Sequence, residues 1–223
     1  MNWSRLCTLV GLVSLALPSL QPASAQTGKV LLIAKDGESA DLDYMLTHEV
    51  GVMTSMLEEA GFEVVVASPS GQSLAGEEHT LTPDLSLAEV STGDFDGIIM
   101  PCMAMEEEAQ VPALEALIKE TVAAGKPVAA QLGSVVQLAR AGVLDGKKFA
   151  YVEEWIPNVP ELAGLDYGGP GVVEEGNVIS SGVCPWAAQA LDAEDTTTAL
   201  TVRWPRKRLS GLAERLSSSR STS

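Results

Sequence analysis

Residues 126–148 read KPVAAQLGSVVQLARAGVLDGKK and predict a buried strand that leads directly into a helix. Residues 128–130 are small and apolar and follow a Gly-Lys-Pro break, which is typical of an inner strand. Residues 135–141 carry apolar side chains at helical spacing and stop at a glycine. The chain must therefore reverse its direction within residues 131–134.

The tip of this turn lacks a nucleophile. In many α/β enzymes a tight strand-to-helix turn lifts a reactive side chain above the sheet and points helix amides at it. Here Leu132 and Gly133 occupy the tip, and neither side chain can attack a substrate. Ser134 follows, but no G-x-S-x-G motif surrounds it, so capping of the helix amino terminus is the expected role and a displaced nucleophile is the alternative.

Further apolar runs predict a mostly parallel sheet with helices on both faces. Continuous apolar strands are expected at 29–34, 62–67 and 96–101, with helices at 111–124 and 135–141. A helix is expected at 44–60, with one buried face formed by Met45, His48, Val52, Met53, Met56 and Leu57. After 141 the pattern predicts shorter strands at 148–152 and within 171–180, where a hairpin is expected, a loop at 155–170 and a closing helix within 187–200. The fold class predicted is an α/β sandwich.

The two ends of the chain differ from its middle. Arg5 precedes an apolar run, and Ala23-Ser24-Ala25 is a small-x-small cleavage signal, so residues 1–25 are expected to be a secretory signal peptide. Residues 26–204 are expected to form one domain. Residues 205–223 are basic and rich in serine, and we expect them to be disordered. The expected location is secreted or periplasmic.

Charge narrows the range of partners. The sequence has 30 acidic and 14 basic residues, and its formal net charge is −16. Many of the basic residues lie after position 202, so the body of the chain is more acidic still. Such a surface repels phosphate backbones, and no nucleic acid partner is expected. No stable membrane insertion is expected after cleavage of the signal peptide.

Cys102 and Cys184 are the cysteines that remain after cleavage. Cys102 follows an inner strand, where α/β sheets gather their ligand sites. It is interpreted in three ways: as a relocated reactive thiol, as a small buried hydrophobe, or as one half of a disulfide with Cys184. No cluster of histidine, cysteine and acidic residues has metal-ligand spacing, so no metal site and no cofactor are expected. His48 and His79 carry no base pattern, and each is expected to be a surface histidine or one with satisfied hydrogen bonds.

Several strings in order resemble the ThiJ/PfpI superfamily, which is related to class I glutamine amidotransferases. They are KVLLIA, EEAGFEVVVASPSG, DFDGIIMP, AAGKPVAA, LARAGVLDGKK and VVEEGNVISS, and the resemblance covers about residues 28–202. It implies a flavodoxin-like three-layer sandwich. It also implies a reactive cysteine at the tight turn, a glutamate facing it and a Pro-Gly-Gly turn behind it.

The resemblance places these family residues on specific positions of this chain. The family's cysteine falls on Leu132, its glutamate on Glu49, and its two glycines on Cys102 and Met103. A leucine cannot form a thiolate, and replacing both glycines is expected to remove the backbone freedom that turns amides toward an oxyanion. The predicted pocket is therefore lined by Glu49, Cys102, Met103, Leu132, Gly133 and Ser134. The resemblance also places Cys184 on a loop at its rim.

These observations favour a domain without the usual cysteine-dependent activity, which binds a small molecule or a protein. The alternative is a hydrolase or glyoxalase-like lyase that uses Cys102 or a water molecule activated by Glu49. Members of the superfamily often dimerise, so the resemblance allows a homodimer, although no feature of the sequence marks an interface.

The signal peptide makes a direct prediction. We expect the mature chain to begin at or near Gln26. Mass spectrometry of the exported protein tests this expectation, and an exported chain that retains Met1 would contradict it.

Overall fold

The structure, a computed structural model, describes residues 28–107 and 109–204. The predicted signal peptide at 1–25 and the predicted tail at 205–223 lie outside these residues. Within the described residues no helix is long and apolar enough to cross a bilayer.

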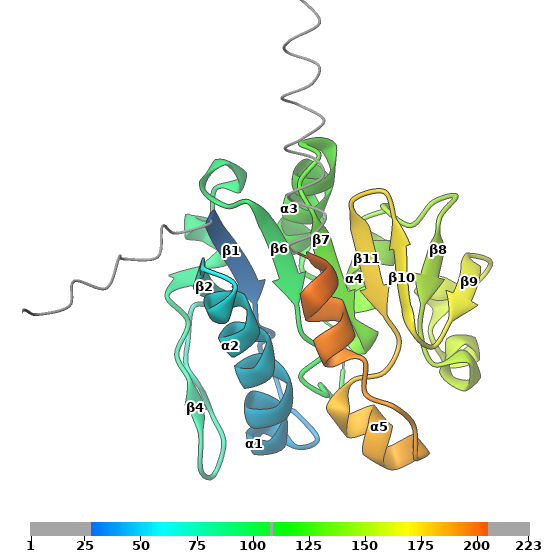
Figure 1. Ribbon diagram of the computed structural model, residues 1–223, viewed down its shortest axis with the longest axis horizontal. Helices are drawn as coiled ribbons and strands as arrows, with labels where there is room; N and C mark the ends of the chain where they lie inside the picture. Colours follow the sequence, from blue (N-terminus) through cyan, green and yellow to red (C-terminus); the bar gives the residue numbers. More distant parts are fainter. Residues whose placement is uncertain (1–27, 108, 205–223) are drawn as a thin grey trace, which may run out of the picture.

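One seven-stranded sheet organises the fold, with strand order β10-β11-β7-β6-β1-β2-β5 (Figure 1). Its neighbouring strands run parallel, except that β10 is antiparallel to β11. The strands are β1 (Gly28–Ile33), β2 (Phe62–Ser68), β5 (Leu85–Ser86), β6 (Gly97–Met100), β7 (Val128–Gln131), β10 (Val172–Glu175) and β11 (Val178–Ser181). Two short pairs stand apart: β3 (Leu74–Ala75) with β4 (Thr80–Leu81), and β8 (Lys148–Ala150) with β9 (Asp166–Gly169).

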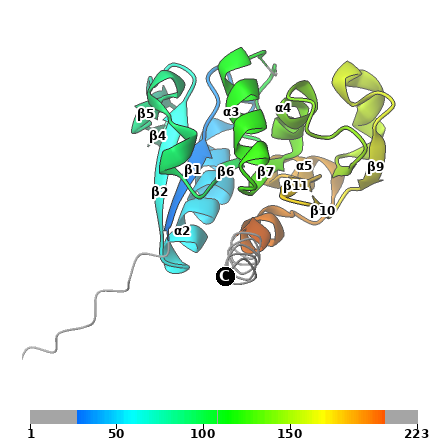
Figure 2. The ribbon, with the colours of Figure 1, turned by 90° about the horizontal axis from the view of Figure 1, so that it is seen from above.

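Helices cover both faces of the sheet. Figure 2 shows α3 and α4 on one face, and α2 with the helical residues 197–204 on the other. The helices are α1 (Leu42–Met45), a π-helical turn (Leu46–Val50), α2 (Gly51–Glu59), α3 (Pro112–Ala123), α4 (Val135–Arg140) and α5 (Pro185–Leu191). Short 3-10 turns lie at Leu87–Glu89, Thr92–Asp94, Leu132–Ser134, Glu153–Asn158 and Pro160–Leu162. The predicted flavodoxin-like sandwich is confirmed.

Alternate residues of the inner strands supply two separate cores. On β1, Leu31 and Ile33 pack under α3 and α4, whereas Val30 and Leu32 pack with the residues of α2 on the opposite face. All four side chains are almost completely buried. Burial on both faces explains why this strand is a continuous apolar run and not an alternating one.

Two expectations for connecting segments are wrong. The segment 155–170 is not a plain loop, since it contains β9 and 3-10 turns. The single closing helix at 187–200 is two helices, because Asp192 adopts a left-handed backbone with φ 49° and ends α5. The hairpin expected within 171–180 is present as β10 and β11.

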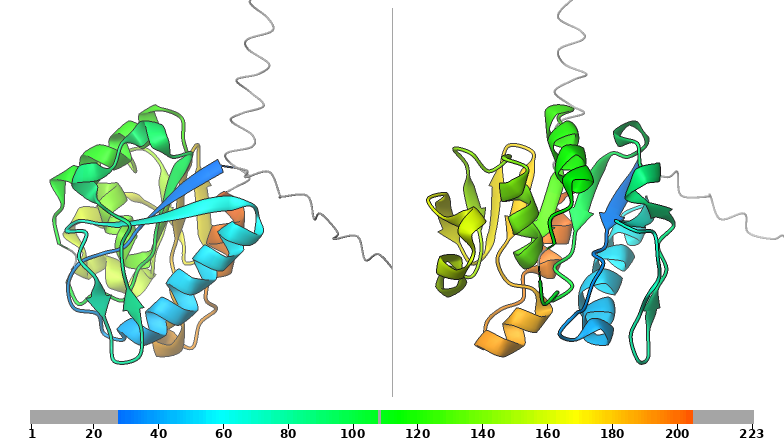
Figure 3. Two further views of the ribbon diagram at one scale, coloured as in Figure 1. Left: turned by 90° about the vertical axis from the view of Figure 1, so that its left-hand side faces the viewer. Right: turned by 180° about the vertical axis from the view of Figure 1, so that it is seen from behind.

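Figure 3 shows the hairpin of β3 and β4 beside the helix that begins with α1. The side chain of Asp43 holds the hairpin there. Its carboxylate accepts hydrogen bonds from the backbone amides of Glu77, Glu78 and His79, at 2.7, 3.2 and 2.7 Å. Desolvation opposes ionisation of Asp43, but these amides outweigh it and lower its pKa. An acidic side chain early in a helix thus fixes a segment whose own sequence is polar and rich in glycine.

Trp204 closes the second core from the far end of the described chain. Its side chain is completely buried, its indole Nε1 donates to the Ile98 carbonyl at 2.9 Å, and its ring meets Phe62 edge-on. A Cβ at Gly97 would lie 2.7 Å from the Trp204 ring, so the glycine allows the close contact. Trp204 therefore belongs to the folded domain.

We expect Trp204→Ala to lower the free energy of unfolding by about 3–5 kcal/mol, because it leaves a large cavity. Val202→Ala, at an exposed position of the same helix, should change it by less than about 0.5 kcal/mol. Urea denaturation followed by circular dichroism measures both changes. Equal effects of the two substitutions would contradict the packing role of Trp204.

Candidate functional site

The candidate site lies at the carboxyl ends of β1, β6, β7 and β11, where the loops of several strands meet. The tight turn after β7 contributes Leu132, and the loop after β6 contributes Cys102 and Met103. Cys184 follows β11, and Glu49 comes from the π-helical turn after α1. Ligand sites of open α/β sheets form at this edge.

The predicted tight turn is present and its backbone is strained. β7 ends at Gln131, Leu132 adopts a left-handed conformation with φ 39°, and α4 begins at Val135. This conformation costs a non-glycine residue about 1–2 kcal/mol. Gln131 anchors the turn from below, because its Nε2 donates to the Val183 carbonyl at 2.9 Å and to Thr197 Oγ1 at 2.8 Å.

Ser134 neither caps the helix nor faces the predicted pocket. Its hydroxyl donates to the Pro101 carbonyl at 2.6 Å, and its side chain makes no capping hydrogen bond to α4. The capping expectation is therefore wrong. Ser134 instead ties the turn after β7 to the end of β6, and it lines a different cavity.

The π-helical turn Leu46–Val50 directs Glu49 into the protein. The extra residue in this turn shifts the buried face of the helix along the chain. Met53 and Leu57 are fully buried, but Val52 and Met56 are only half-buried and His48 is exposed, which corrects the expected helix face. His79 is also exposed, as expected.

Glu49 is completely buried and binds the backbone of the loop after β6. Its Oε1 accepts from the Cys102 amide at 2.9 Å, and its Oε2 accepts from the Met103 amide at 2.8 Å. Burial and the neighbouring Cys102 thiol raise the pKa of Glu49 well above its usual value, although the two amides and Lys35 oppose the shift. Glu49 therefore ties the π-helical turn to the loop after β6.

The turn at residues 101–104 has the backbone that glycines would favour, although it contains none. Met103 and Ala104 have φ values of 56° and 47°. The expected loss of backbone freedom is therefore wrong for Met103, whereas Cys102 does not adopt a left-handed backbone. Ser39 Oγ donates to the Met103 carbonyl at 2.6 Å and the Ala40 amide donates to the Ala104 carbonyl at 2.8 Å, so surrounding hydrogen bonds impose it.

Cys102 and Cys184 are both buried and are not joined by a disulfide, and their thiols contact one another. A hydrogen bond to Cys102, together with burial, raises the pKa of the Cys184 thiol. The structure therefore lacks the disulfide that was one of the three interpretations, although the two residues do lie side by side. Cys102 is about 5% exposed and is the cysteine that reaches the pocket surface.

A pocket of about 450 Å³ opens above the tight turn, and we call it the aromatic pocket. Its floor contains Cys102, Leu132 and Gly133, as expected. Glu49 and Met103 lie beneath this floor, fully buried, and are not lining residues, which corrects the predicted set. The walls are formed by Ala40, Ala104, Met105, Glu106, Tyr151, Trp155 and Trp186.

Sequence reasoning missed the aromatic wall. The rings of Trp155 and Trp186 have centroids 6.4 Å apart, and Tyr151 lines the same pocket. Trp155 begins the segment that was expected to be a loop, and Trp186 follows Cys184. Aromatic residues form only 4% of the chain, and three of them lie in this one wall. Their rarity was the signal in the sequence that could have drawn attention to them.

Comparison with known proteins agrees with this architecture. The model of the DJ-1/PfpI family matches residues 29–191. The chain belongs to the DJ-1/PfpI family. A deglycase of Thermococcus kodakarensis is 32% identical over 156 residues, which cover 69% of this chain and 89% of the relative. A deglycase of Pyrococcus abyssi is 32% identical over 133 residues, which cover 57% of this chain and 77% of that protein.

Solved structures of this family share the fold. The ThiJ/PfpI domain protein of Brachyspira murdochii has a TM-score of 0.61 at 17% identity, covering 79% of this chain and 93% of that one. Oxidized DJ-1 of Toxoplasma gondii has a TM-score of 0.55 at 22% identity, and the match covers 85% of this chain and 98% of that one. The recognition of the superfamily from sequence is thereby confirmed.

We expect the stability of the wild type to fall relative to Glu49→Gln as the pH rises from about 5 to about 8. The folded-state pKa of Glu49 is raised, so the folded protein holds a proton that the unfolded chain releases. The stability linked to this proton is complete below the unfolded pKa of about 4.3 and is lost as the pH rises toward the folded pKa.

Urea denaturation at several pH values measures the difference between the two proteins. Glu89→Gln is the control: hydrogen bonds from Ser86 lower the pKa of this exposed carboxyl, so its difference from wild type should stay constant over the same range. A wild type that gains stability relative to Glu49→Gln with rising pH would contradict the account.

Proposed function

We propose that this DJ-1/PfpI domain is an exported protein that binds a small apolar or aromatic molecule in the aromatic pocket, without cysteine chemistry at residue 132. The observation that carries the proposal is the composition of the pocket. Where the family resemblance places a thiolate, the floor presents the side chain of Leu132, and two tryptophans and a tyrosine form the walls.

The hydrogen bonding beneath the pocket supports binding over catalysis. An oxyanion needs amide donors that point toward it. The amides of Cys102 and Met103 already donate to Glu49, which lies outside the pocket lining. Glu49 is also fully buried and does not line the pocket, so it has no contact with a water molecule there. This argues against catalysis by a water molecule that Glu49 activates.

The pocket's shape and charge indicate the class of ligand. A concave pocket with aromatic walls suits a small molecule better than a protein surface. Glu106 is the ionisable carboxyl in its lining, and the whole chain has a net charge of −16. An anion would be repelled, whereas a neutral or cationic molecule with a flat apolar body can stack on the tryptophans.

A second candidate function rests on Cys102. This thiol reaches the pocket surface beside Leu132, and two relatives at 32% identity carry the name deglycase. A lyase or hydrolase reaction at Cys102 would use a thiol hydrogen-bonded to Cys184. Because the pKa of Cys184 is raised, this thiol stays protonated and is not a second nucleophile.

Binding is tested with the neutral fluorophore N-phenyl-1-naphthylamine. We expect it to quench tryptophan fluorescence and to gain emission of its own, because Trp155 and Trp186 line the pocket. Ala40→Phe, at an exposed position on the rim, should weaken binding at least about tenfold, the factor given by about 1.4 kcal/mol. Ala163→Phe, at an exposed position outside the pocket lining, is the matched control and should bind like the wild type.

Turnover separates the two candidate functions. The wild type and Cys102→Ser are incubated with methylglyoxal, and its disappearance is followed. We expect no difference between the two proteins. Turnover that is lost in Cys102→Ser but retained in Cys184→Ser would replace the binding proposal with the enzyme.

A further inference from the structure

A second, more enclosed cavity lies on the side of α3 and α4, and we call it the enclosed cavity. Its volume is about 130 Å³. None of the described residues that line it is aromatic, in contrast to the wall of the aromatic pocket. Apolar side chains form most of its wall: Ile33, Ala34, Pro69, Met100, Val111 and Leu114.

The enclosed cavity lies at the point of the sheet where the strand order reverses. Its lining residues Ile33 and Met100 end β1 and β6, which are neighbours in the sheet. From β1 the chain continues to β2 on one side, whereas from β6 it continues to β7 on the other side. The helices that follow, α2 and α3, therefore lie on opposite faces (Figure 2). Open α/β sheets bind small molecules in the crevice beyond the strand ends at such a point.

A short two-stranded contact separates the enclosed cavity from the aromatic pocket. Met105 and Glu106 line the aromatic pocket, and the backbone of both pairs with the segment after β1. Ser39 forms a bridge with Met105, and the Glu106 amide donates to the Glu38 carbonyl at 3.0 Å. The two linings have no residue in common, so the two hollows are distinct sites.

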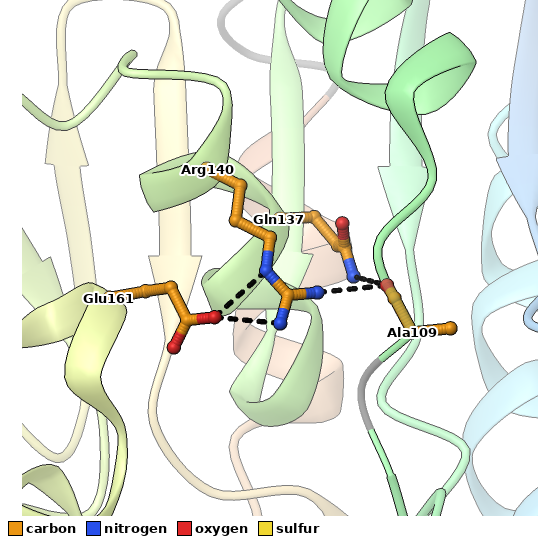
Figure 4. Close-up of polar contacts among 4 residues, drawn as sticks. All are labelled: Ala109, Gln137, Arg140 and Glu161. Atoms are coloured by element: carbon orange, nitrogen blue, oxygen red, sulfur yellow. Dashed lines mark hydrogen bonds and ion pairs between the residues drawn. The ribbon is translucent and has the colours of Figure 1, made fainter.

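Hydrogen bonds within the protein fix the wall on the side of α4. Gln137 Nε2 and Arg140 Nη1 donate to the Ala109 carbonyl at 3.0 and 2.8 Å. Glu161 Oε1 accepts from Arg140 Nε and Nη2 at 3.0 and 2.7 Å, which holds the guanidinium group in place (Figure 4). Because Ala109 and Gln137 both line the cavity, this wall is formed before a ligand enters and costs little to organise.

The two polar side chains of the inner wall are engaged with the protein itself. Ser134 donates its hydroxyl proton to the Pro101 carbonyl at 2.6 Å, and Gln137 donates from its amide nitrogen to Ala109. Both side chains are almost completely buried, and Gln137 Oε1 is closed off, so a molecule in the cavity cannot reach it. The inner wall therefore presents an apolar surface to a ligand.

We propose that the enclosed cavity binds a compact, uncharged, hydrocarbon-like molecule of about the size of a six-membered ring. The volume of about 130 Å³ is comparable to that of about 150 Å³ in an engineered apolar cavity that holds benzene. A hydrogen-bonding group against the inner wall would lose its bonds to water without a replacement. The charged lining residues Lys35, Asp36 and Glu107 are half-buried or exposed, which places them toward solvent.

The probes are cyclohexane and 1,4-dioxane, two rings of similar size that differ in two oxygen atoms. These oxygens lie on opposite sides of the dioxane ring, so one of them faces the apolar wall in any orientation. Isothermal titration calorimetry is done on the full chain with Ala40→Phe, which blocks the aromatic pocket. We expect cyclohexane to bind this variant at least about tenfold more tightly than dioxane.

Two further substitutions, each added to Ala40→Phe, test the location. Val111→Phe fills the cavity from a half-buried lining position, and Ala109→Phe fills it from an exposed one, where a larger side chain meets little packing. Each should weaken cyclohexane binding at least about tenfold. Val90→Phe, at a half-buried position outside both linings, is the matched control and should leave the affinity unchanged. Urea denaturation checks that each variant is folded.

Three results would overturn the proposal. They are no binding of cyclohexane to Ala40→Phe, equal binding of cyclohexane and dioxane, and cyclohexane binding that neither Val111→Phe nor Ala109→Phe weakens. The test holds whether or not the aromatic pocket binds a ligand, because that pocket is blocked in every protein used and is assayed separately with N-phenyl-1-naphthylamine.

Discussion

The contact on which the site depends is the double hydrogen bond between the Glu49 carboxyl group and the amides of Cys102 and Met103. It joins the helix after β1 to the loop after β6, in a completely buried position. A carboxyl group there is stable only where amides satisfy its oxygens. The π-helical turn delivers this group, and the left-handed backbone at Met103 aligns the second amide. Two locally unfavourable conformations thus meet at one buried contact, and the hydrogen bonds from Ser39 and Ala40 support the second of them.

This contact also limits the chemistry available above it. Amides that bind a buried carboxyl group are not free to stabilise charge on a ligand in the aromatic pocket. Cys102 is the thiol that lines the pocket, and its hydrogen bond with Cys184 raises the pKa of Cys184. The lining of the pocket is mostly apolar and aromatic. Its aromatic wall, built from the segment after β8 and from α5, is the feature that a ligand would contact most.

The inner strands and the tight turn could be predicted from sequence because they are set by local patterns. Apolar runs identify strands that are buried on both faces, and a strand that meets a helix without a linker must turn sharply. The position of Glu49 was available only through the family resemblance. The burial of Glu49 could not be predicted, since the π-helical turn is an irregularity that helical periodicity does not reveal. The aromatic wall could not be predicted either, because it joins Tyr151, Trp155 and Trp186 from segments whose approach depends on tertiary packing.

The strained turn at Leu132 has a structural role that does not depend on a nucleophile, because its residues line two cavities. Residues 132 and 133 line the aromatic pocket, whereas Ser134 and Gln137 line the enclosed cavity on the other side of the loop after β6. A turn with ordinary backbone would separate these side chains differently, because the left-handed residue sets the direction in which α4 leaves the sheet. Ser134 fixes that direction through the Pro101 carbonyl, and Arg140 fixes the far end of α4 through Glu161. The same few residues therefore shape both hollows, so the strained backbone follows from the packing of α4 and is not by itself evidence of catalysis.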